Sequence, residues 1–160
     1  MLVKRTMSKN VVSVSVPGNR EKVLDLMRKE KKAVLPVVKE DTDILVGLVT
    51  RSDLINNPDE EQIAMLMSRD LVTVNPGDDV IDAARKMIEN DVRRVPVVND
   101  DGELVGIITS FDLVSKALTK IEVNDAVENY MITTVPTTWE NAPLNVAFES
   151  MKQFGLKSII

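Results

Sequence analysis

The chain of 160 residues contains neither cysteine nor histidine. It therefore has no disulfide, thiol nucleophile or histidine base, and nearly every kind of zinc site is excluded. The Walker and dinucleotide-binding glycine motifs are also missing, and paired acids such as Asp100 and Asp101 have no partner nucleophile or base. We therefore expect no catalytic residue, no bound metal and no enzyme activity.

Aromatic residues make up only 3% of the chain, and the formal net charge is −5. A negative balance argues against broad nucleic-acid binding, and few aromatics argue against base-stacking platforms. No apolar run approaches the roughly 18 residues of a membrane helix, and the N-terminus does not look like a signal peptide. We expect a cytoplasmic protein with neither a membrane nor a nucleic acid as partner.

What the sequence does contain is a segment written twice. Residues 11–54 return as residues 71–113, so that LPVV and LVGLVTRSDL recur as VPVV and LVGIITSFDL. Met7 recurs sixty positions later, and Gly47 recurs fifty-nine positions later. A repeat of this kind determines the fold. It predicts a pseudo-symmetric pair with sites where the two copies meet.

Each copy predicts the order strand, helix, strand, turn, strand, helix. Asp78 or Asp79 is the expected cap of the helix in the second copy, and Gly102 the residue that allows its hairpin turn. Acids after Pro58 predict a connecting helix over residues 59–67. The expected strands are residues 12–16, 35–38 and 45–50, then 71–74, 95–98 and 104–109; the expected helices lie around residues 23–27, 80–88 and 111–118.

A third copy begins and then stops. Five of its residues match residues sixty-four positions earlier, namely Met131, Thr137, Leu144, Ala147 and Met151. A half-repeat leaves strand edges uncovered, so we expect the parent protein to continue with the rest of this copy. The expected domains are residues 1–58 and 59–125, which form one pair because about 60 residues are marginal alone, and a truncated copy at 126–160.

The ordered set V-x-[ST]-V, helix, [LV]-P-V-V, turn, [LV]-V-G-[LI]-[VI]-T-x-x-D-L resembles the CBS motif, named after cystathionine β-synthase. The resemblance covers residues 7–119 in two full copies and 131–160 in a partial one. It implies an α/β (α+β) fold in which two motifs, each a small sheet with two helices, pack as a pseudo-two-fold pair.

For function, the resemblance implies a regulatory module that senses adenosyl compounds, such as AMP, ADP, ATP or S-adenosylmethionine, in the clefts between the motifs. No cofactor is obligatory, and the implied partners are the ligand, a second copy in a homodimer and a regulated protein. The alternative is a structural module that dimerises or docks a partner while its clefts stay empty.

The resemblance also implies the site residues. Asp53 and Asp112 correspond to ribose-binding acids, although both also fit plain helix caps. Each begins a helix, where free N–H groups suit a phosphate. The hydroxyls that add donors belong to Thr50, Ser52, Thr109 and Ser110, with Phe111 in place of Ser52 in the second copy. The expected adenine walls are Val12, Ser13, Leu35, Pro36 and Val37, and Val72, Thr73, Val95, Pro96 and Val97.

A phosphate-bearing ligand needs local cations in an acidic protein. Arg93 and Arg94 precede the second proline-containing strand, whereas Ala33 and Val34 align with them in the first copy. Arginine binds phosphate with a bidentate fork, so we expect one site to prefer a phosphate-bearing ligand. Neighbours on an extended segment face opposite ways, so only one arginine should face the cleft. A solvated arginine pair is the alternative, and we interpret the cluster from Arg28 to Lys32 as a solvated helix end.

Overall fold

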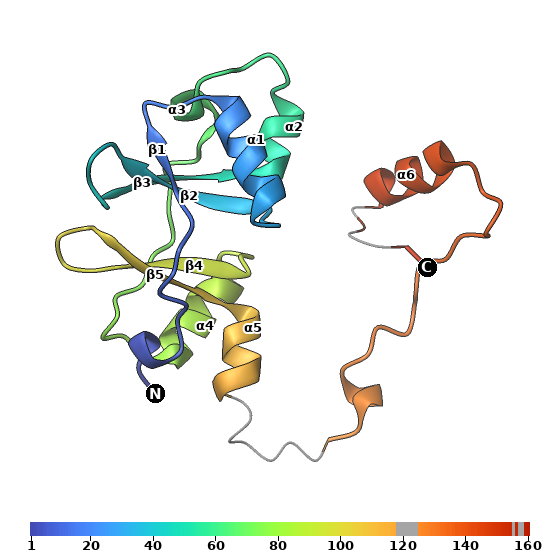
Figure 1. The fold of residues 1–160 in the computed structure, drawn as a ribbon. Coiled ribbons are helices and arrows are strands. Elements are labelled where there is room, and N and C mark those ends of the chain that lie inside the picture. The colour runs from blue at the N-terminus through green and yellow to red at the C-terminus, as the bar shows by residue number, and fades with distance from the viewer. Residues whose placement is uncertain (118–124, 155, 157–158) are drawn as a thin grey trace. The chain divides into compact units, whose positions relative to one another are not determined.

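The computed structural model describes residues 1–117, 125–154, 156 and 159–160. The chain divides into two compact units, Met1–Glu122 and Val123–Ile160. The first unit consists of two α/β halves of similar build, one above the other in Figure 1. The α/β class predicted from the repeat is therefore confirmed, and each half has its own hydrophobic core.

The first half is a three-stranded sheet with helices. Strand β1 (Val14–Val16) runs parallel to β2 (Val34–Lys39), which pairs antiparallel with β3 (Leu45–Thr50). Helix α1 (Arg20–Lys29) is capped by Asn19, whose side chain accepts a hydrogen bond from the Lys22 N–H, and α2 (Arg51–Asn56) follows β3 directly. The predicted order of elements is confirmed in this half.

The second half repeats this build with a smaller sheet. Helix α4 (Val80–Glu89) is capped by Asp79, and β4 (Arg94–Val98) pairs antiparallel with β5 (Leu104–Thr109). Gly102 has the predicted positive φ of 79° in the hairpin turn. Helix α5 (Ser110–Asp112) continues as a π-helical turn, η2 (Leu113–Ala117). The predicted helix end at residue 118 lies outside the described residues.

Two predicted elements are shorter in the structure. Of residues 71–74, only Val74 pairs, in a single parallel bridge to Val97. The helix predicted from residue 59 was wrong: α3 spans only Ile63–Leu66. Its first turns cannot form because backbone hydrogen bonds from Arg20 N–H to Glu61 O and from Ile63 N–H to Gly18 O hold this part of the chain extended.

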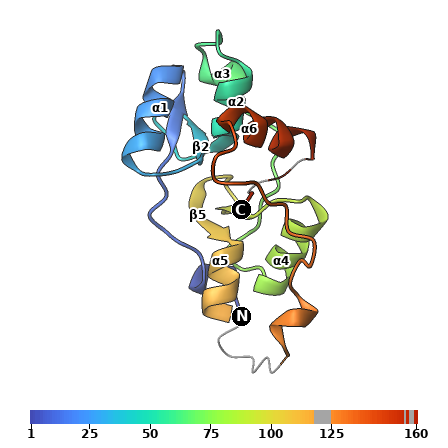
Figure 2. The ribbon, with the colours of Figure 1, turned by 90° about the vertical axis from the view of Figure 1, so that its right-hand side faces the viewer.

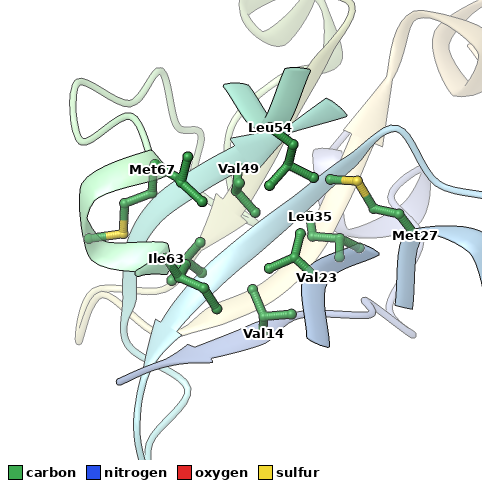
Figure 3. Packing of buried hydrophobic residues seen from close by; sticks show 10 residues of the cluster. Val14, Val23, Met27, Leu35, Val49, Leu54, Ile63 and Met67 are labelled. Atoms are coloured by element: carbon green, nitrogen blue, oxygen red, sulfur yellow. The ribbon is translucent and has the colours of Figure 1, made fainter. Parts of the chain in front are cut away.

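The segments that precede the two motifs are exchanged between the halves. Helix α3 lies with α1 and α2, whereas the N-terminal turn η1 (Val3–Arg5) lies with α4 and α5, as both views show (Figure 1, Figure 2). Ile63 points into the first core (Figure 3), to which Met67 also belongs, and Val3 is buried in the second. Each half therefore needs residues from the other repeat to complete its core.

Equivalent backbone pairs fix this exchange. Ser8 and Ile107 exchange two N–H···O bonds of 2.9 and 3.0 Å, and Ser68 and Leu48 exchange two of 2.9 and 3.0 Å. A Cβ on Gly106 would lie 2.5 Å from the Met7 sulfur, and one on Gly47 would lie 2.5 Å from the Met67 sulfur. The repeated Met and Gly residues are thus explained, because each methionine crosses to the glycine of the other motif.

In the second unit, helix α6 (Leu144–Gln153) has the bounds of α4 shifted by sixty-four positions. Backbone hydrogen bonds elsewhere in this unit also repeat those of the second motif. Thr138 N–H donates to Ile160 O over 2.6 Å, as Val74 N–H donates to Pro96 O over 3.2 Å. These equivalences support our proposal that residues 126–160 begin a third motif. No helix in the described parts of the chain is long and apolar enough to cross a membrane.

Candidate functional site

A pocket of about 350 Å³ lies between the two halves of the first unit. Its volume is within the range of small-molecule sites, about 300 to 1,000 Å³. One wall comes from the chain before β1 and from β2, and the other from β4, β5 and α5. The lining residues are Ser8, Asn10, Val11, Val12, Lys32, Val34, Pro36, Arg94, Ile107, Thr109, Phe111 and Asp112. Both repeats therefore contribute to one pocket.

The polar end of the pocket is a capping box at the start of α5. The Asp112 Oδ2 atom accepts hydrogen bonds from Thr109 N–H over 3.0 Å and from Thr109 Oγ1 over 2.6 Å. Asp112 N–H donates back to Thr109 Oγ1 over 3.1 Å. The helix cap is thus the threonine, with the aspartate at the third helical position. Thr50 and Asp53 make the equivalent box at α2.

Lys116 distinguishes the second box from the first. Its Nζ donates to Asp112 Oδ1 over 2.9 Å and to the Thr6 carbonyl over 2.7 Å. Asn57 takes the equivalent position in the first motif, and its side chain donates to the Asp53 carbonyl. Sequence reasoning missed Lys116, although its spacing of four residues from Asp112 on a helix was a usable signal.

These contacts fix the charge of Asp112. Burial alone would raise the pKa of this carboxyl group, but the hydrogen bonds from Thr109 and Lys116 together with the Lys116 charge outweigh it, and the pKa is lowered. The residue as a whole is only 7% exposed. It therefore stays negative at neutral pH on the wall of the pocket, as an acceptor for hydroxyl groups.

Two cations line the same pocket. Arg94 is half-buried on its wall, whereas Arg93 is exposed and is not a lining residue. Lys32, which we had interpreted as part of a solvated helix end, also lines the pocket. The N–H groups at the start of α5 are largely used, because Ser110 N–H donates to Arg93 O and Asp112 N–H to Thr109 Oγ1. A phosphate would therefore depend on the two side-chain cations.

The apolar wall is only partly the one expected from the sequence. Val12 and Pro36 line the pocket, together with Val11 and Val34, which the sequence did not single out. Four expected wall residues have fully buried side chains in the two cores, so these side chains do not face this pocket; they are Leu35, Val37, Val95 and Val97. Other expected site residues do not line this pocket either; they are Ser13, Thr50, Ser52, Asp53, Val72, Thr73, Pro96 and Ser110.

Comparison with known proteins decides the family. A profile described as CBS domain matches residues 3–60 and 62–118. The chain belongs to the CBS domain family. The two matches make it a CBS pair, as the repeat predicted. Within the described residues, no group of three or more acidic side chains could hold a metal ion.

Three curated relatives of this CBS pair are longer than the chain. Protein MJ0188 of Methanocaldococcus jannaschii is 29% identical over 120 residues, which are 74% of this chain and 44% of that protein. Protein MJ1225 of the same organism is 24% identical over 178 residues, 99% of this chain and 64% of that protein. A relative from Methanopyrus kandleri, MK0525, is covered over 48% of its length. The chain thus spans about half to two thirds of these relatives.

Solved structures share the fold of the CBS pair. The MJ1225 structure aligns over 100% of this chain and 66% of its own, with a TM-score of 0.82 and 22% identity. CBSX2 in complex with AMP aligns over 74% and 97%, with a TM-score of 0.68 and 29% identity. The CBS pair of MJ0100 in complex with 5-methylthioadenosine and S-adenosyl-L-methionine aligns over 75% and 98%, with a TM-score of 0.67 and 29% identity. Two similar CBS pairs therefore bind adenosyl compounds.

Proposed function

We propose that this CBS pair is a regulatory module that senses an adenine nucleotide in the pocket between its motifs. The observation that carries the proposal is that Asp112, Arg94 and Lys32 line one pocket together with apolar residues such as Val12 and Pro36. In this assignment a ribose hydroxyl donates to Asp112, and the phosphate accepts from Arg94 and Lys32. The adenine ring packs against Val12 and Pro36. No chemical step is required of any residue.

The charges of the pocket favour a phosphate-bearing ligand. Arg94 and Lys32 attract a phosphate, and arginine offers a bidentate fork. The sulfonium of S-adenosylmethionine is itself positive, so the same two side chains repel it. CBSX2, which binds AMP, supports this choice of ligand. AMP is therefore the first ligand to test, with S-adenosylmethionine as the contrasting one.

We predict that AMP raises the melting temperature of the protein more than S-adenosylmethionine or methylthioadenosine does. A ligand held at 100 times its Kd stabilises the fold by about 2.7 kcal/mol, which a thermal-shift assay detects easily. The panel should also include ADP and ATP. No shift with any of the five compounds would contradict the proposed function.

Alanine variants of the two acids then locate the binding site. Asp112→Ala should weaken AMP binding about tenfold or more in calorimetry, whereas Asp53→Ala should leave the pocket lined by Arg94 functional. The two substitutions break equivalent capping boxes, so each controls for the loss of stability in the other. Equal losses of AMP affinity would contradict the asymmetry between the two motifs.

A homodimer is a second candidate function, because the outer face of α4 carries two exposed isoleucines. Ile88 is 81% exposed and Ile81 64% exposed, whereas the equivalent residues on α1 are Arg28 and Glu21. Helix α4 packs beside η2, on which Val114 is also exposed. A two-fold dimer would bring this face of the second motif against its own copy.

We predict that the protein is a dimer in light scattering with or without AMP, and that Ile88→Glu makes it monomeric. The charge would be buried without a partner in such an interface. Arg28→Ala is the matched control at the equivalent position of α1, and it should leave the dimer intact. A monomeric wild type, or a dimer that survives Ile88→Glu, would exclude this interface.

A further inference from the structure

The two Thr-x-x-Asp acids differ in the acceptor positions that they leave free. In both, Oδ2 accepts the backbone N–H and the hydroxyl of the preceding threonine. The Oδ1 atom of Asp53 accepts no hydrogen bond from any residue that the structure describes, whereas Oδ1 of Asp112 accepts from Lys116. The two acids therefore differ at Oδ1, the oxygen that remains available to a ligand.

A carboxylate offers about four acceptor positions, two on each oxygen. The threonine uses both positions on Oδ2 in each motif. Two positions therefore remain on Asp53, enough for two vicinal hydroxyls, but only one remains on Asp112. The count predicts that Asp112 binds one sugar hydroxyl.

Lys116 is held on its second side as well. Its Nζ donates to the carbonyl of Thr6, a fully buried residue of the exchanged N-terminal segment. Two charge-assisted hydrogen bonds at 2.7 and 2.9 Å join this ammonium group to the protein, and the second is also an ion pair. A ribose hydroxyl that displaced Lys116 from Asp112 would break an ion pair. The position that Lys116 occupies is therefore closed to the ligand.

We propose that Lys116 determines the sugar specificity of the Asp112 pocket, so that the pocket binds AMP and 2′-deoxy-AMP with similar affinity. The inference rests on the proposed function, because it takes Asp112 as the ribose acceptor. The ligand class is an adenine nucleotide with at least one free sugar hydroxyl. Lys116 acts through Asp112 and does not itself contact the ligand, so it is a positioning residue.

The test is calorimetry with AMP and 2′-deoxy-AMP on the full chain that carries Asp53→Ala, which removes the acid of the other motif. With Lys116 present, the two Kd values should agree within about threefold. Lys116→Met opens the second position on Oδ1, and AMP should then bind about tenfold or more tightly than 2′-deoxy-AMP, since a hydrogen bond to a charged group is gained by one ligand only. Lys116→Arg keeps a cation and should keep the ratio of the lysine protein.

Losing the hydrogen bond to the Thr6 carbonyl could lower the stability of a variant. The ratio of its Kd values for the two ligands is not affected by such a loss, because both are measured on the same protein. A tenfold preference for AMP while Lys116 is present, or an unchanged ratio in Lys116→Met, would overturn the inference while leaving the proposed function intact. The measurement with native Lys116 stands even if the methionine variant does not fold. Binding of neither nucleotide would overturn the proposed function and this inference with it.

Discussion

Arg94→Met is expected to bind AMP about tenfold more weakly, or worse, while its affinity for adenosine changes less than about twofold. Arg94 is the first residue of β4, and it lines the pocket. Its guanidinium group can bind a phosphate with two hydrogen bonds. Methionine keeps much of the length and apolar stem of arginine, so the wall of the pocket stays covered. Isothermal titration calorimetry with both ligands measures the difference directly.

The neighbouring residue supplies the control for this prediction. Arg93 precedes Arg94, is exposed and is not among the lining residues. Arg93→Met changes the net charge by the same amount and should leave AMP binding within about twofold of the wild type. If both variants lose AMP affinity equally, the arginines act through the general field of the surface, and the assignment of Arg94 to the phosphate fails.

Ile63→Ala is expected to lower the free energy of unfolding by about 2 to 5 kcal/mol. Ile63 is fully buried in the first core (Figure 3), although it belongs to the segment that leads into the second repeat. The substitution leaves a cavity among side chains of the other repeat, such as Val14 and Val23. Urea denaturation followed by circular dichroism measures the loss.

Met65 lies two residues further along the same short helix and is 69% exposed. Met65→Ala should change the free energy of unfolding by no more than about 0.5 kcal/mol, because it leaves the core intact. Similar losses for the two variants would show that helix α3 contributes through its own stability and not by filling the first core. The exchange of segments would then not be what joins the two halves.

The sequence predicted the scaffold well because the two copies can be aligned with each other, so that an element found in one copy predicts the same element in the other. Period-two and helical patterns placed β3, β5 and α4, and Asp79 and Gly102 took their predicted roles. The exchange of the preceding segments was not predicted, since local patterns do not say which core a short helix joins. Met7 packs against Gly106, and Met67 packs against Gly47. The structural reason why these methionines and glycines recur is therefore visible only in the assembled pair.

The site was predicted in part for similar reasons. Alternation along an extended segment predicted that only one of the two arginines faces the cleft, and only Arg94 is a lining residue. The contact of Lys116 with the Thr6 carbonyl spans 110 positions, and no sequence pattern indicates it. Leu35 and Val37 were expected in the wall by resemblance, but their side chains fill the first core. Lys32 is exposed, as the interpretation of a solvated helix end requires, but it also lines the pocket, which the sequence did not predict.

A crystal structure of the full chain with AMP tests the central proposal most directly. We predict AMP in the pocket between the motifs, with a ribose hydroxyl within hydrogen-bond distance of Asp112 Oδ1, the phosphate beside Arg94 and the adenine against Val12 and Pro36. Lys116 should keep its contact with Asp112. AMP bound elsewhere, or bound in this pocket with its phosphate away from Arg94 and its ribose away from Asp112, would contradict the account.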